Sequence, residues 1–162
     1  MVRWSDGLYG GLIAGLTSAI FYAVVAVAWL REATLGEFFS QPAQALPPFH
    51  GAPGSALLAT FGFVVYLLTA AFFGVVYALL ARRLPSMWRA PTSVLWGLAY
   101  GVVVWWILND VVVPVSGATN VQPLWQGIVG TVVCYGMVLS ELTTVAHRRA
   151  GSLTSLTATG RE

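Results

Sequence analysis

The chain has 162 residues, of which 57% are hydrophobic and 9% are charged. Soluble domains carry about 25% charged residues, so a water-soluble domain of this length could not bury so much apolar surface. The formal net charge of +2 comes from few groups and excludes a strongly basic nucleic-acid surface. We therefore expect an integral membrane protein whose apolar surface faces the lipid bilayer.

Four apolar segments are each long enough to cross a bilayer as a helix, which needs about 20 residues. They cover residues 7–30, 56–81, 92–113 and 124–146. The first is longer than the apolar region of a signal peptide, about 7–15 residues, so we expect it to be retained. The predicted fold class is all-α, with four transmembrane helices arranged as two hairpins in a domain over residues 1–149. A polar tail over residues 150–162 would be disordered alone.

The arginines predict the topology of the chain. Arg31 lies at the outer end of the first span, whereas the other seven arginines fall on the opposite side of the predicted spans. Because positive charge is retained on the cytoplasmic side, we expect both termini to be cytoplasmic. The predicted location is the cytoplasmic (inner) membrane of a bacterium.

The one sizeable loop, residues 31–55, therefore faces outward. Leu35, Phe38 and Phe39 beside Glu37 predict a short interfacial helix within it. The loop either contacts a partner subunit or is a passive connector.

Stripes of small residues, mostly at four-residue spacing, predict where the helices pack. A helix brings residues four apart onto one stripe, and small residues there let two backbones approach closely in lipid. The glycines expected at helix contacts are Gly7, Gly11, Gly15, Gly74, Gly97, Gly101, Gly127 and Gly130. Two local similarities, Gly11-Leu12 with Gly97-Leu98 and Phe73-Gly74 with Tyr135-Gly136, also suggest a duplicated hairpin.

The third span, residues 92–113, has two specialised faces. Its glycine face contains Gly101, and the opposite face contains Trp96, Trp106 and Asp110. Asp110 lies near the outer end of its helix, where the helix dipole disfavours a carboxylate. Asp110 either pairs with Arg31 or extends into the lipid headgroups. We expect the Trp96/Trp106/Asp110 face to contact other membrane subunits.

Glu141, near the inner end of the fourth span, is the second acidic candidate. It shares a helical stripe of small and polar residues with Arg148, so we expect it to face protein. An ion pair, either with Arg148 or with Arg82-Arg83, and a role in proton relay are the two interpretations.

No cofactor site is predicted from the chain's own side chains. His50 and His147 both lie away from the middle of the membrane, which argues against a haem or chlorophyll held by imidazole. No metal-ligand set, nucleophile–base pair or phosphate loop can be assembled, so we expect neither catalytic nor metal-binding residues. Contact with lipid or pigment is left open.

The pattern GLxxG…FGVVYALLARRLP…VLWGLAYGVVVWW resembles the uncharacterised small four-helix inner-membrane proteins of bacteria, over about Gly7 to Arg149. The resemblance implies a four-span fold and supplies no established site residues. We expect a non-catalytic accessory subunit of a larger membrane complex, respiratory or photosynthetic. The alternative is a small transporter or channel that works as a homo-oligomer.

Overall fold

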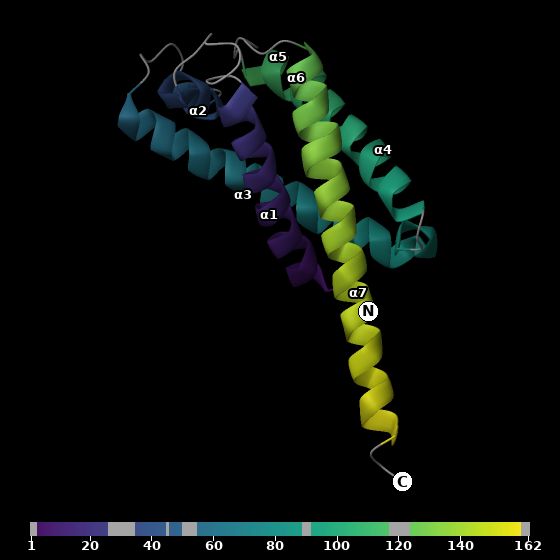
Figure 1. Ribbon diagram of the computed structural model, residues 1–162. Helices are drawn as coiled ribbons and strands as arrows, with labels where there is room; N and C mark the ends of the chain where they lie inside the picture. The colour runs from purple at the N-terminus through teal and green to yellow at the C-terminus, as the bar shows by residue number, and fades with distance from the viewer. Residues whose placement is uncertain are drawn as a thin grey trace.

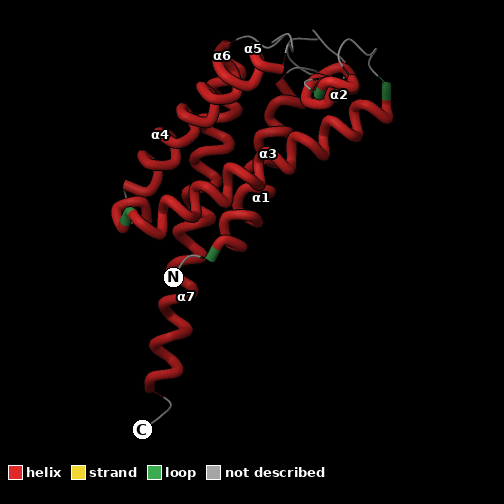
Figure 2. The backbone as a smooth tube through the Cα atoms, turned by 180° about the vertical axis from the view of Figure 1, so that it is seen from behind, coloured by secondary structure: helices red, strands yellow, loops and turns green. Residues whose placement is uncertain are grey.

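The computed structural model describes residues 3–25, 35–44, 46–49, 55–88, 92–116 and 124–159. Within these ranges the chain forms helices joined by short loops, with no strand (Figure 2). Three helical stretches are long and apolar enough to cross a membrane, namely Ala56–Arg83, Thr92–Val112 and Trp125–Arg149. The chain is therefore an all-α protein with the helices of a membrane protein.

Helix α1, Trp4–Ala23, begins at a capped terminus. The Oδ2 atom of Asp6 accepts a hydrogen bond of 2.7 Å from the backbone N–H of Arg3, and satisfies a donor that would otherwise lack a partner. Residues 26–30 of the predicted first span, with Arg31 after them, lie outside the described residues.

Helix α2, Leu35–Gln44, lies where the sequence predicts a short helix in the outer loop. It packs on the first half of α3, Ala56–Arg83, with the rings of Phe39 and Phe63 edge to face at 5.1 Å. Ala43 and Ser40 of α2 are buried. Part of the predicted loop is therefore a packed layer on the bundle, extended by the 3₁₀ turn Pro47–Phe49.

Helices α3 and α4 meet at one end of the bundle and diverge toward the other. The 3₁₀ turn η3, Pro85–Trp88, follows α3 and precedes α4, Thr92–Trp106. Figures 1 and 2 show α3 running obliquely away from α4 toward α2. At its far end α4 widens into a π-helical turn, η4 (Ile107–Val112), followed by α5 (Val113–Ser116).

The last segment is one continuous rod made of α6 (Leu124–Ile128), the π-helix η5 (Val129–Met137) and α7 (Val138–Thr159). Figure 1 shows α7 projecting well beyond the other helices. The tail that would be disordered alone continues α7 as far as Thr159, because an existing helix adds one hydrogen bond for each residue that it extends.

The protein core is small and lies where α1, α3 and the last rod meet. Its buried side chains include Ala14, Tyr77, Tyr135 and Leu139. Many large apolar side chains instead point outward; Phe72, for example, is 63% exposed. Such a surface suits lipid, which solvates apolar side chains as well as a protein interior does.

Candidate functional site

Helices α1 and α3 are in backbone contact along a glycine seam. A Cβ atom added at Gly74 would lie 2.6 Å from the Cα of Gly11 and would collide with the carbonyl oxygen of Gly7. A Cβ at Gly11 would lie 2.5 Å from the carbonyl oxygen of Ala70. At this separation no side chain fits between the helices, so glycine is required at these positions. Gly15 continues the seam against the Cβ of Ala70.

A second seam joins α4 to the last rod with the same geometry. A Cβ added at Gly136 would collide with the carbonyl oxygen of Gly97 and lie 3.2 Å from the Cα of Gly101. The contacts of the two seams therefore correspond residue by residue when Gly97 takes the position of Gly7. The duplication suggested by the sequence aligns Gly97 with Gly11 instead, one helical turn away from this register.

Two polar side chains of α1 bond to the backbone of the last rod where it becomes π-helical. Ser18 Oγ donates to the carbonyl oxygen of Gly130 at 2.8 Å, and Tyr22 OH donates to that of Gly127 at 3.3 Å. A Cβ added at Gly130 would overlap the Tyr22 ring. A π-helix disturbs the regular backbone pairing, and neighbouring hydroxyls satisfy the freed carbonyls.

Three more tyrosines fasten helices to one another in the same way. Tyr135 OH donates to the carbonyl oxygen of Ala70 at 2.7 Å, and Tyr100 OH donates to that of Phe73 at 2.6 Å. Tyr66 OH donates to the carbonyl oxygen of Gly15 at 3.2 Å. Sequence reasoning missed these contacts. The sequence signal for such a contact is a tyrosine in one span at the same depth as a small residue in another span. The tyrosine ring can then reach the backbone of the neighbouring helix.

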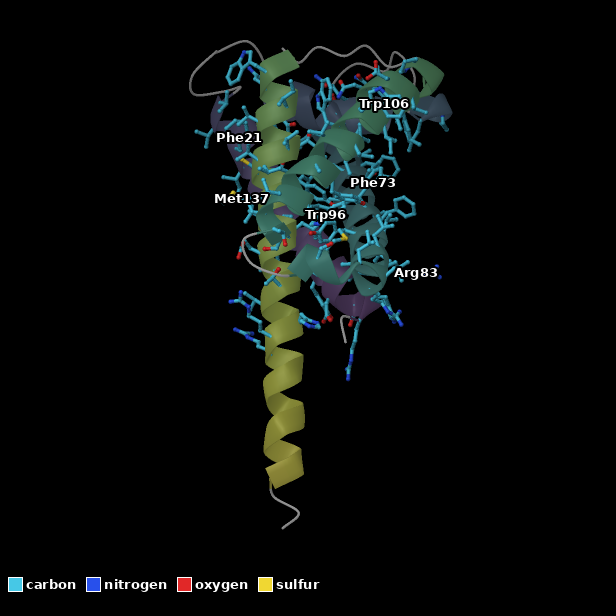
Figure 3. The ribbon with its side chains drawn as sticks, turned by 90° about the vertical axis from the view of Figure 1, so that its right-hand side faces the viewer. Phe21, Phe73, Arg83, Trp96, Trp106 and Met137 are labelled. Atoms are coloured by element: carbon cyan, nitrogen blue, oxygen red, sulfur yellow. The ribbon has the colours of Figure 1, made fainter. Side chains whose placement is uncertain are left out.

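The predicted specialised face of the third span is the uncovered side of α4. Trp96 and Trp106 are 38% and 54% exposed, and Asp110 is exposed on η4. Figure 3 labels both tryptophans along this side. Within the most apolar 18 residues of each candidate span, the share of residues that are buried is 44% in Trp125–Arg149, 28% in Ala56–Arg83 and 17% in Thr92–Val112. This helix therefore has the largest uncovered face of the three.

Arg31 lies outside the described residues, so its pairing with Asp110 stays a prediction. Asn109, beside Asp110, donates from Nδ2 to the carbonyl oxygen of Trp105 at 2.9 Å.

Glu141, which the sequence predicts to face protein, is not buried within the described bundle. Glu141 and Arg148 are both exposed, whereas Ser140 and Thr144 face inward. The prediction assumed 3.6 residues per turn throughout the span. The π-helix η5 has more residues per turn, so the residues after Met137 are rotated away from the faces that an α-helix would give them.

No group of three or more His, Cys, Asp or Glu residues that could hold a metal ion occurs in the described part of the chain. No protein-family model, no curated protein and no solved structure matches this chain. The features on which a function can be argued are therefore the uncovered face of α4 and the charged groups at the helix ends.

Proposed function

We propose that the chain is a four-span accessory subunit of a larger integral membrane complex of the bacterial inner membrane, and that it is not an enzyme. The three apolar helices and α1, whose 20 residues reach about 30 Å, would form the spans. The exposed Arg3, Arg82 and Arg148 lie at one end of these helices, which supports an arrangement with both termini cytoplasmic.

The observation that carries the proposal is the composition of the α4 surface. A carboxylate, Asp110, and a tryptophan, Trp106, share an apolar face that no described part of the chain covers. A charge facing lipid is disfavoured by about 3 kcal/mol at the centre of a bilayer and by less near its edge. A neighbouring subunit with a basic or hydrogen-bonding group at this depth would remove that penalty and would bury Trp106. The packed α2 layer adds a second contact surface for such a partner.

The experiment is mild solubilisation of native membranes that contain a tagged chain, followed by quantification of the co-purifying subunits. We expect an unlike subunit at fixed stoichiometry with the wild-type chain, and its loss with Trp106→Ala/Asp110→Asn. The matched control is Phe72→Ala, which removes an exposed aromatic from α3. Loss of the partner in the control as well, or its retention in the α4 variant, would contradict the proposed contact.

A homo-oligomeric transporter or channel is the second candidate. It is favoured by the π-helical stretches η4 and η5, because π-helices are frequent at functional sites. It predicts an oligomer of this chain alone, with solute flux in liposomes that Asp110→Asn abolishes. Fixed stoichiometry with an unlike subunit and no flux would favour the accessory subunit.

A further inference from the structure

Exposed arginines gather at one end of the bundle, the end where α1 begins and α3 finishes. Figure 3 shows Arg83 there, with its guanidinium directed away from the helices. The described exposed arginines are Arg3, Arg82, Arg83, Arg148 and Arg149. All of them lie at this end, so the described part of the chain has a basic end and an opposite end without arginine.

The contact between α1 and α3 places arginines of both helices at one depth. A Cβ at Gly7 would lie 2.5 Å from the Cβ of Ala78, so these two residues are level with each other. Arg3 precedes Gly7 by four residues, and Arg82 follows Ala78 by four. The helices run in opposite directions, so each arginine lies about 6 Å beyond that contact along its own helix, at 1.5 Å per residue, and toward the same end of the bundle.

The last rod adds a third arginine at the same depth. A Cβ at Gly10 would lie 3.9 Å from the Cβ of Leu142, which fixes the level of α7 beside α1. Arg3 precedes Gly10 by seven residues, and Arg149 follows Leu142 by seven. Each therefore lies about 10 Å beyond this contact. Three helices thus bring arginines to one plane.

Helix electrostatics do not explain this plane. A cation is favoured at the C-terminus of a helix and disfavoured at its N-terminus. Arg82 is in the last turn of α3, but Arg3 is the residue before the first turn of α1, and Arg149 lies in the interior of α7. The three positions differ in the helix dipole that acts on them, but they lie at the same depth. Their common property is therefore their position relative to the surroundings of the protein.

The side chains around the plane match a membrane–water interface. Trp4, next to Arg3, is 61% exposed, as expected for an interfacial tryptophan, and Leu79 and Leu80 are exposed on the apolar side of Arg83. Asp6, three residues after Arg3, accepts a hydrogen bond from the backbone of Arg3. Glu141 lies seven residues before Arg148 on α7, toward the membrane.

We infer that this arginine plane binds the phosphodiester headgroups of anionic phospholipids. A guanidinium can pair with two phosphate oxygens at once, whereas a zwitterionic headgroup presents a cation beside its phosphate. Anionic lipid is therefore preferred to zwitterionic lipid at this end of the bundle. The inference requires the apolar helices to lie in a bilayer, and it does not depend on the partner proposed for α4.

The test is native mass spectrometry of the full chain in detergent, titrated with dioleoylphosphatidylglycerol or dioleoylphosphatidylcholine. Wild type should bind the anionic lipid more tightly than the zwitterionic lipid. Arg82→Gln/Arg83→Gln should weaken anionic-lipid binding by about 30-fold, at about fivefold per arginine near an anionic surface. Binding of the zwitterionic lipid should be unchanged. Arg82→Lys/Arg83→Lys, which keeps the charge and loses the paired geometry, should fall between the two.

A second variant guards against misfolding of α3. Arg3→Gln alters a different helix and should weaken anionic-lipid binding by about fivefold. Equal affinity of wild type for the two lipids, or unchanged anionic-lipid binding in a glutamine variant, would overturn the inference. Competition by millimolar inorganic phosphate would also overturn it, because the site would then bind a free anion instead of a lipid.

Discussion

Replacing Gly74 with alanine should separate the first two long helices. The new methyl group would lie 2.6 Å from the Cα of Gly11, where ordinary contacts begin at 3.4 Å. The obstacle is backbone, which cannot rotate away as a side chain can. The two helices must therefore move apart by about 0.8 Å along this seam.

A gap of this size forfeits a quarter to a half of the dispersion energy between facing atoms. Overpacking of this kind destabilises a protein by about 1–3 kcal/mol. Alanine is also a better helix former than glycine by about 1 kcal/mol, which partly offsets the loss. The loss of packing energy should therefore be measured against a second Gly→Ala variant, which has the same gain in helix propensity.

Gly10→Ala is that control. A Cβ at Gly10 meets the Cδ1 atom of Leu139 at 3.2 Å, the far end of a side chain that can shift. Unfolding of both variants by dodecyl sulfate in mixed micelles, followed by circular dichroism, should place Gly74→Ala about 1–3 kcal/mol below Gly10→Ala. Equal stability of the two variants would refute the assignment of the seam as a backbone contact.

Two further predictions concern hydroxyls and the outer helix. Tyr135→Phe should lose about 0.6 kcal/mol of unfolding free energy with its bond to Ala70, a typical value for a hydrogen bond between membrane helices. Tyr77→Phe should be neutral or stabilising in the same assay, because the Tyr77 hydroxyl is buried without a hydrogen-bond partner in the described structure. Gly62→Ala should release α2, because its methyl group would collide with the carbonyl oxygen of Phe39. Hydrogen exchange over residues 35–44 should then speed up while the unfolding midpoint of the spans stays unchanged. An unchanged exchange rate there would contradict the packing of α2.

Glycine spacing indicated most of the contact positions, and the reason is geometric. Gly7, Gly11 and Gly74 stand out because four-residue spacing within an apolar run is visible in one segment alone. Gly62 was missed because it has no such companion within α3, and its partner Phe39 lies in the outer loop. A single glycine facing another segment leaves no pattern in either one.

The orientation of the last span could not be predicted from the sequence. The residues from Val129 to Met137 are π-helical, and no residue in this stretch identifies the wider turn in advance. It coincides with bonds from Ser18 and Tyr22 of a distant segment. The helix form therefore depends on tertiary contacts, and an error in the assumed period moved Glu141 from the surface to the interior.

The order in which the seams are completed bears on how the chain is made. The α1–α3 seam is complete once residues up to Ala78 have been synthesised. Gly97 and Gly101 of α4 instead meet the backbone of Gly136 and Val132 and the side chain of Ser140. Chains are synthesised from the N-terminus, so α4 must enter the bilayer before its partner exists. With the preceding α3 it shares the bond from Tyr100 to Phe73 and the edge-to-face packing of the Tyr77 and Tyr100 rings at 5.0 Å. During synthesis the protein therefore passes through a stage in which α1 and α3 are already packed together and α4 has not yet met the last rod.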